Sequence, residues 1–123
     1  MTENMQEQFK RRLYSFVLRL IKFVESLKKT QTSKIVGDQL LRSGTGILGT
    51  YIEGLSASSK REYTNYFNYS LKSANESKVW TAVLKDTGNG NQKEANWLLK
   101  ELNEISSIFA SSLLTLKGKR KTI

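Results

Sequence analysis

Two glutamates in this 123-residue chain stand beside aromatic residues and are the first candidates for chemistry. Glu76 lies one helical turn before Trp80, and Glu53 directly follows Tyr51 and Ile52. Because burying an unpaired carboxylate is costly, each side chain needs a hydrogen-bond partner or a raised pKa. A pair of such carboxylates could serve in acid–base catalysis or hold a magnesium ion.

The same two carboxylates also fit a purely structural role. In that role each accepts hydrogen bonds from Tyr, Ser, Arg or Lys on a facing helix, and Arg42 is a candidate cation for one of them. We favour this role and expect Arg42, Glu53 and Glu76 to make structural polar contacts. A metal-dependent hydrolase or nuclease that uses Glu53 and Glu76 is the enzymatic alternative.

Histidine and cysteine are both absent from the chain, which excludes most other catalytic and metal sites. Without Cys there is no disulfide, thiolate nucleophile or Cys-ligated zinc. Without His there is no Ser-His-Asp triad, no imidazole base and no Glu-x-x-His di-iron site. We therefore expect a protein with no enzyme activity, no catalytic residue, no metal and no cofactor.

The chain carries 20 Lys and Arg against 11 Asp and Glu, a formal charge of +9. This surplus favours binding to polyanions through phosphate contacts that depend on salt and carry little sequence information. Plain solubility is the competing explanation, and a membrane-surface helix is a weaker one because the apolar side of the first helix is needed for the core. The residues we expect to contact phosphates are Arg12, Arg19, Lys22, Lys60, Arg61, Lys119 and Arg120.

The elements that must position these residues are four helices. Polar or Gly-containing interruptions fall at residues 28–33, 54–59 and 87–91, and no Pro breaks the segments between them. We expect helices over about 4–29, 33–53, 59–86 and 91–116, with Ser59 and Asn91 as helix caps. Three short connections favour an antiparallel up-and-down four-helix bundle, a single domain over residues 1–116 followed by a basic tail at 117–123.

Two of the four segments have unusual faces. The first segment is apolar over so much of its circumference that we expect neighbours on more than one side, either within its own bundle or from another subunit. The third segment carries a stripe with helical spacing, flanked by Phe67, Leu71 and Ala74; its members are Tyr66, Tyr69, Ser73, Glu76, Trp80 and Val83.

Glycines are concentrated in the second segment, at Gly44, Gly46 and Gly49. Each glycine inside a helix costs about 1 kcal/mol relative to Ala, so a cluster needs a reason. A phosphate-binding loop would require a GxxxxGK[ST] pattern after a strand, and neither feature is present. The sequence therefore predicts close approach of another helix at these positions.

Several motifs together resemble a known family. Residues 42–47, Arg-Ser-Gly-Thr-Gly-Ile, followed by Tyr51, Glu53 and Gly54, resemble the second-helix signature of the small bacterial four-helix-bundle proteins encoded in intervening sequences of 23S ribosomal RNA genes. Residues 70–76 with Trp80 are similar to the third-helix signature, and residues 98–105 to the last helix. The family pattern usually has Ser in place of Gly46 and Asn in place of Thr50, so a polar site that depends on those two side chains is in doubt here.

The resemblance implies a four-helix bundle that assembles into a ring-like homopentamer. It also implies kinship with the accessory variability determinants of diversity-generating retroelements, basic pentamers that bind nucleic acid and assist a reverse transcriptase. A pentamer would carry five times the charge of one chain, which strengthens the attraction for RNA or DNA.

Together these features predict a non-enzymatic, homo-oligomeric protein that binds nucleic acid, RNA more than DNA. The alternative is a structural or protein-interaction module, such as a partner of a reverse transcriptase, whose charge serves solubility. The longest uncharged stretch, residues 43–52, is too short and too weakly apolar to span a bilayer, and the polar N-terminus is unlike a signal peptide. We therefore expect a cytoplasmic protein without a membrane partner.

Overall fold

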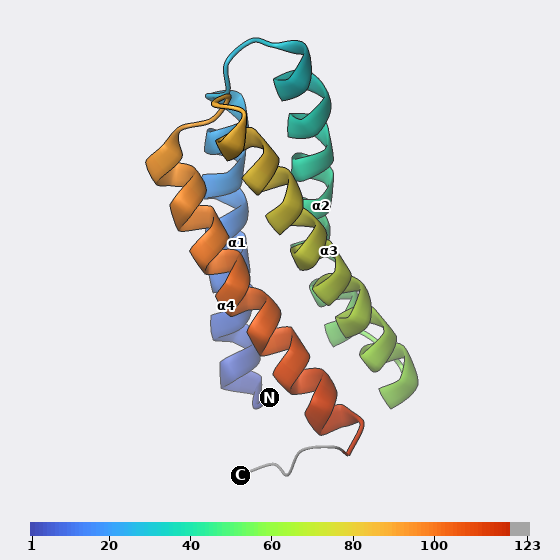
Figure 1. Ribbon diagram of the computed structural model, residues 1–123. Helices are drawn as coiled ribbons and strands as arrows, with labels where there is room; N and C mark the ends of the chain where they lie inside the picture. Colours follow the sequence, from blue (N-terminus) through green and yellow to red (C-terminus); the bar gives the residue numbers. More distant parts are fainter. Residues whose placement is uncertain (119–123) are drawn as a thin grey trace.

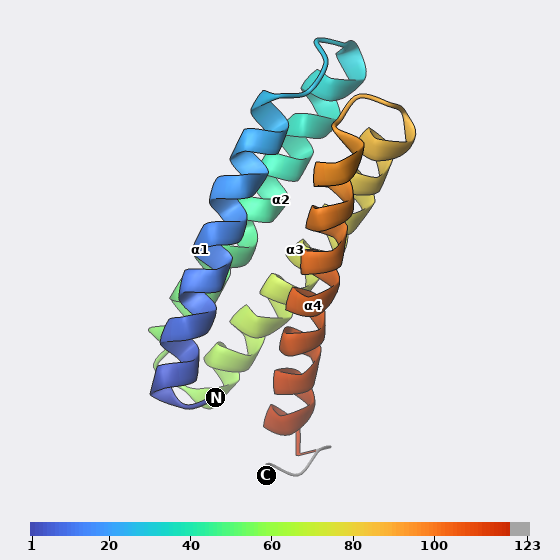
Figure 2. The ribbon, with the colours of Figure 1, turned by 90° about the vertical axis from the view of Figure 1, so that its left-hand side faces the viewer.

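The computed structural model describes residues 1–118, which form four antiparallel helices along one direction (Figure 1). The helices are α1 (Glu3–Glu25), α2 (Gln31–Leu55), α3 (Lys60–Asp86) and α4 (Gln92–Leu116). The predicted all-α four-helix bundle is confirmed, and no strand occurs within the described residues. Seen from the side, α1 lies beside α2 and α4 covers α3 (Figure 2).

Each helix begins at a side chain that caps its free backbone N–H groups. Ser59 and Asn91 accept hydrogen bonds from the backbone of the residue three positions later, as predicted. The second helix starts earlier than predicted because Thr30 supplies the cap oxygen, bonded to the N–H of Ser33. The first helix ends at Glu25, and the residues that follow it turn toward the α3–α4 connection.

The four helices share one apolar core whose lower part is aromatic. Phe109 packs edge-on against Phe9 and Phe67, with ring centroids 5.2 and 5.4 Å apart. Tyr51 is fully buried among these rings and donates its hydroxyl hydrogen bond to the carbonyl of Gln6. This burial raises the pKa of the Tyr51 hydroxyl, so the side chain stays neutral and uncharged in the core.

The closest pair of helices is α2 and α3, and small polar residues line their contact. The Ser43 and Ser77 hydroxyls are 2.8 Å apart, and those of Thr50 and Ser70 are 2.6 Å apart. Short side chains allow the backbones to approach, and the paired hydroxyls satisfy each other in a buried setting. Thr50 therefore makes a polar contact at the position where the family usually has Asn.

The glycines of α2 divide into two groups. A Cβ atom at Gly44 would lie 2.2 Å from Cδ2 of Leu20, and one at Gly54 would lie 3.0 Å from Cβ of Tyr66, so helix packing needs glycine at both positions. Close approach was predicted for Gly44 but not for Gly54. A Cβ at Gly46 would meet only the Ser73 hydroxyl at 3.5 Å, and one at Gly49 would meet nothing within 4 Å. Packing within this chain does not explain Gly49.

The aromatic stripe singled out on the third helix lies on the outside of the bundle. Tyr69 is 52% exposed and Glu76 is also exposed, whereas the flanking residues Phe67 and Ala74 are fully buried. The face of α3 that points to the core has the same helical spacing but small residues at half of its positions: Phe67, Ser70, Ala74, Ser77, Thr81 and Leu84.

None of the helices in residues 1–118 combines the length and apolar character that crossing a membrane requires.

Candidate nucleic-acid interface

The α1–α2 and α3–α4 connections are joined at one end of the bundle. The N–H of Lys28 donates to the carbonyl of Asn89 at 2.9 Å, and the Thr30 hydroxyl bonds to Oδ1 of Asn89 at 2.7 Å. Asn89 is buried, and Gly88 beside it adopts a φ of 71°, a left-handed turn directly after the end of α3. These bonds fix the lysines of both connections relative to each other at the upper end in Figure 1.

Six lysines lie on these connections and on the adjoining helical turns. We call them the loop-end lysines: Lys22, Lys28, Lys29, Lys34, Lys85 and Lys93. Within residues 1–118 none of the six forms an ion pair with a carboxylate. The acids on the same turns are Glu25, Asp38, Asp86 and Glu94, and Glu94 is paired with Arg19, so positive charge is in excess at this end.

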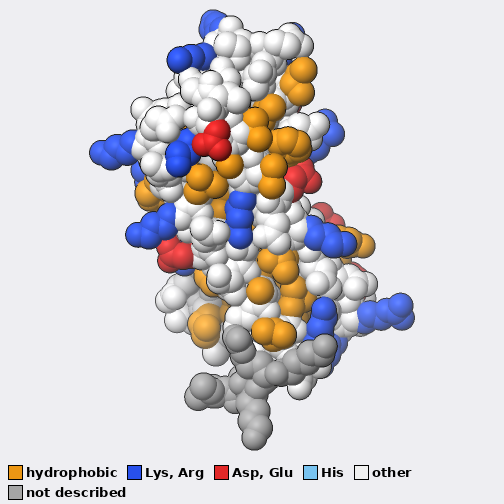
Figure 3. All heavy atoms as spheres, in the orientation of Figure 1, with side chains coloured by type: hydrophobic (Ala, Val, Ile, Leu, Met, Phe, Trp, Pro, Cys, Tyr) orange, Lys and Arg blue, Asp and Glu red, His pale blue; other side chains and the backbone are white. Residues whose placement is uncertain are grey.

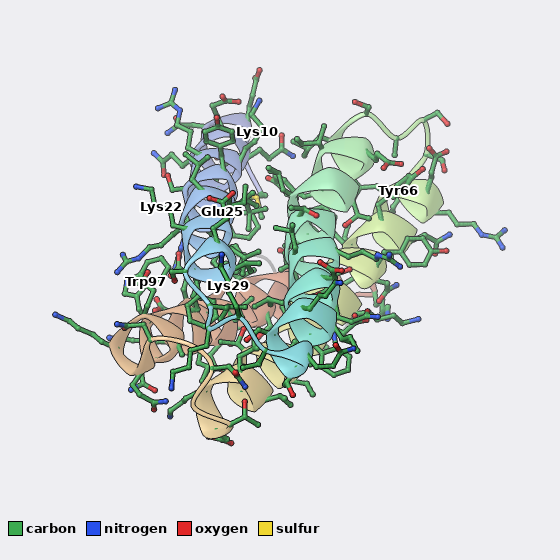
Figure 4. The ribbon with its side chains drawn as sticks, turned by 90° about the horizontal axis from the view of Figure 1, so that it is seen from above. Lys10, Lys22, Glu25, Lys29, Tyr66 and Trp97 are labelled. Atoms are coloured by element: carbon green, nitrogen blue, oxygen red, sulfur yellow. The ribbon has the colours of Figure 1, made fainter. Side chains whose placement is uncertain are left out.

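Two surface hollows accompany the loop-end lysines. The first, of about 590 Å³, is lined by Lys28, Lys29 and Lys34 together with Glu25 and Asp38. The second, of about 780 Å³, runs between α1 and α4 and is lined in part by Lys22 and Lys93. In the view from above, Lys22 and Lys29 belong to the α1 side of the molecule, and Tyr66 lies on the opposite side (Figure 4). Each hollow is therefore a surface recess with lysine side chains among its lining residues.

Arg12 is held by carboxylates of α4. Its guanidinium donates to both oxygens of Glu101, at 2.9 and 2.7 Å, and to Glu104 at 3.2 Å. This forked geometry is among the stronger forms of ion pair, and Glu101 raises the pKa of Arg12 further. Since the N–H groups of its guanidinium bond to carboxylates of α4, Arg12 links α1 to α4, and we leave it out of the interface proposed below.

Arg19 lies two helical turns after Arg12 on α1 and also contacts α4. It bonds to Glu94 of α4, and its guanidinium carbon lies 3.7 Å from the ring centre of Trp97, a cation–π contact. The backbones of α1 and α4 approach each other closely at few positions, so these long side chains join the two helices alongside the core contact of Phe9 with Phe109. Arg19 is left out of the proposed interface for the same reason as Arg12.

The ion pair between Arg19 and Glu94 should make the free energy of unfolding depend on pH in the acid range. The hydrogen bond from Arg19 lowers the pKa of Glu94 below its usual value of 4.5. A lowered folded-state pKa contributes stability that is complete above the unfolded-state pKa and is lost as the pH falls through the folded-state pKa. The free energy of unfolding of the wild type should therefore fall below about pH 4.5 more steeply than that of Glu94→Gln, measured by urea denaturation across pH. Parallel pH curves for the two proteins would contradict this assignment.

The other predicted phosphate contacts do not join the loop-end lysines. Lys60 and Arg61 start α3, at the opposite end of the bundle from Lys22. Lys119 and Arg120 lie outside the described residues. Further cations are scattered along the face formed by α3 and α4 (Figure 3). Of the five predicted residues that the structure describes, Lys22 alone lies at the loop end.

The two candidate carboxylates are exposed and held by aromatic donors. The Tyr66 hydroxyl, from the facing helix α3, hydrogen-bonds to Glu53, which raises the pKa of that tyrosine. Trp80 donates its Nε1–H to Glu76 at 3.1 Å from one turn away on the same helix, not from a facing one. Arg42 is exposed and pairs with neither glutamate. Among residues 1–118 no three acidic, His or Cys side chains gather as a metal site would require.

Sequence reasoning left five of the six loop-end lysines out of the predicted phosphate contacts. A signal was available, since Lys28, Lys29, Lys85 and Lys93 lie within or next to predicted turns. That the two turns meet could not be read from the sequence, because the bonds to Asn89 are made between residues far apart in the chain.

Two comparisons with known proteins agree with the fold and the motifs. The family model of the 23S rRNA-intervening sequence protein matches residues 6–111. A solved structure of a protein with unknown function from the S23 ribosomal protein family of Bacteroides thetaiotaomicron is similar to this chain, with 27% identity and a TM-score of 0.78. The match covers 85% of this chain and 96% of that one. No curated protein matches this chain.

Proposed function

This chain belongs to the family of 23S rRNA-intervening sequence proteins, and from this premise we propose that it is a non-enzymatic, homo-oligomeric protein that binds nucleic acid, RNA rather than DNA. The observation that supports the proposal best is the set of loop-end lysines, six cations without ion pairs on two connected turns. Contacts of this kind address the phosphate backbone and do not read bases.

The proposal extends to the assembly and the biological setting. We propose a homopentamer that, like the accessory variability determinants of diversity-generating retroelements, acts beside a reverse transcriptase in the cytoplasm. Glu53 and Glu76 receive no catalytic role in this proposal, since each is bound to an aromatic donor on the outside of the bundle. Full retention of any nuclease activity in Glu76→Gln would agree with that assignment.

A salt titration of RNA binding by the purified protein tests the nucleic-acid proposal. If six lysines each neutralise one phosphate of a single strand, log K should fall against log salt with a slope of about −4. A fourfold rise in salt should then weaken binding by about two orders of magnitude. Filter binding measures this directly, and affinity that is absent at low salt or does not change with salt would overturn the proposal.

A protein-interaction module is the second candidate function, and the exposed apolar side chains favour it. Tyr14 is 57% exposed, Leu18 47% and Tyr69 52%. Exposed patches of large apolar side chains mark surfaces that bind other proteins. In this alternative the charge serves solubility and the partner is another protein, such as a reverse transcriptase. Capture of one protein partner that survives nuclease treatment, together with the absence of RNA affinity, would favour it over RNA binding.

A further inference from the structure

The outer side of the α1–α2 pair carries an apolar hollow that the bundle leaves uncovered. We call this surface the α1/α2 face and define it by Lys10, Arg11, Tyr14, Leu18, Leu48 and Ile52. All of these residues except Leu18 line a hollow of about 490 Å³, and Ile52 among them is 44% exposed. The first helix was predicted to have neighbours on more than one side, and it packs on both α2 and α4 within this chain, yet Tyr14 and Leu18 stay exposed. The α1/α2 face is therefore an unpartnered apolar surface with a basic rim.

A second outer surface lies on the neighbouring side of α2, where α2 adjoins α3. We call it the α2/α3 face and define it by Arg42, Gly46, Gly49, Glu53, Tyr66, Tyr69, Ser73, Glu76 and Trp80. Gly49 is exposed in mid-helix, where glycine is unfavourable, and a Cβ there would touch nothing in this chain. The neighbouring rings of Tyr66 and Tyr69 lie 6.2 Å apart, and Tyr69 is half exposed. A glycine beside exposed aromatic rings suits the close approach of a helix from outside.

The two carboxylates of the α2/α3 face outnumber its one cation, Arg42, and are complementary to the cations of the α1/α2 face. On the α2/α3 face, Tyr66 and Trp80 each donate one hydrogen bond, to Glu53 and Glu76, and so hold two carboxylates at the surface. Each carboxylate keeps further acceptor positions free. The α1/α2 face offers the Arg11 guanidinium, which forms no ion pair within residues 1–118, and Lys10, whose pair with Glu7 is exposed.

We propose that copies of this chain associate head-to-tail, with the α1/α2 face of one copy packed on the α2/α3 face of the next. The proposal rests on the homo-oligomer of the proposed function and names its contact surfaces. The two faces differ in shape and charge, so the contact is between unlike surfaces, the kind that closes into a ring. Tyr14 and Leu18 supply the apolar anchors, and Gly49 provides room for them against the backbone of α2.

Head-to-tail packing would also bring the loop-end lysines of neighbouring copies together. Both faces lie along the sides of the helices, whereas the loop-end lysines lie at their ends. Copies packed side by side with the same orientation bring their loop ends to one rim of the assembly. A strand of nucleic acid laid along that rim meets several sets of lysines at once, which raises affinity beyond that of one copy.

Two complementary variants test the head-to-tail contact. Tyr14→Glu/Leu18→Glu alters the α1/α2 face, and Gly49→Leu alters the α2/α3 face; all three positions are exposed, so each variant should fold. Asn103→Leu, an exposed position on α4 away from both faces, is the matched control. Sedimentation and far-ultraviolet circular dichroism report the mass of the assembly and the fold of each variant.

Each face variant alone should be a folded monomer, and the control should assemble as the wild type does. Mixed in equal amounts, the two variants should form a dimer and nothing larger, because each retains the face that the other lacks. Wild-type assembly by either variant, or a mixture that stays monomeric, would overturn the proposal. A wild-type protein that is monomeric but binds RNA with the expected salt slope would overturn this contact and leave the nucleic-acid function standing.

Discussion

Replacing Gly44 by valine is expected to lower the free energy of unfolding by about 3 kcal/mol, the upper range for forcing extra atoms into a well-packed core. A Cβ at this position would lie 2.2 Å from Leu20 Cδ2, and Leu20 is fully buried and cannot move into solvent. Rotation about χ1 leaves Cβ in place and so cannot relieve this contact, and the two γ-methyl groups of valine add further bulk. Urea denaturation followed by circular dichroism measures the loss.

Gly49→Val is the matched control for this substitution. It makes the same chemical change on the same helix, at a position where a Cβ meets nothing within 4 Å. At protein concentrations low enough to keep the chain monomeric, its stability should equal or slightly exceed that of the wild type, because valine is a better helix former than glycine. Equal stabilities for the two variants would show that α1 does not pack on Gly44 as described.

Neutralising three loop-end lysines should weaken RNA binding by tenfold or more at low salt. In Lys28→Gln/Lys29→Gln/Lys34→Gln, up to three phosphate contacts are lost, and the slope of log K against log salt should become shallower by about 2. The three side chains are exposed and form no ion pairs within residues 1–118, so the fold should be preserved. Filter binding across salt concentrations gives both numbers.

A second triple variant distinguishes an effect of the loop-end lysines on RNA affinity from an effect of the net charge of the protein. Lys60→Gln/Arg61→Gln/Lys117→Gln removes the same net charge from the opposite end of the bundle. Its affinity should fall far less than that of the loop-end variant, and its salt slope should stay near that of the wild type. Equal losses in the two triple variants would mean that RNA responds to net charge alone and that the loop end is not the interface.

The parts of the fold that depend on local sequence could be predicted. Ser59 and Asn91 cap their helices through bonds to residues three positions away, so the pattern is visible in the chain itself. The spacing of Leu98, Leu102 and Ile105 likewise marks a buried face that the structure confirms.

The buried face of α3 was harder to recognise because it is less apolar than the exposed one. Close approach of α2 and α3 selects Ser70 and Ser77 for the interior, and their hydroxyls find partners on Thr50 and Ser43. Because of its aromatic residues, the outer stripe of α3 is more hydrophobic than the face that packs on the core, so a hydrophobic pattern marks the wrong face as buried. Hydropathy cannot show that a small polar residue is buried when the reason is the distance between two backbones.

The roles of the arginines depended on contacts that no spacing rule predicts. Arg12 and Arg19 were predicted to contact phosphates, yet each is paired with carboxylates of α4, at the far end of the sequence. The loop-end lysines became one surface only through Asn89, which joins the two connections. Candidate residue types were readable from the sequence, whereas their grouping required the fold.

Lysine footprinting with and without bound RNA tests the central claim most directly. The wild-type protein is acylated under limiting reagent, and the modification of each lysine is quantified by mass spectrometry. RNA should protect Lys28, Lys29 and Lys34 strongly and leave Lys60 and Lys117 unchanged. Protection that is uniform over the molecule, or confined to Lys60 and Lys117, would contradict the assignment of the loop end as the nucleic-acid interface.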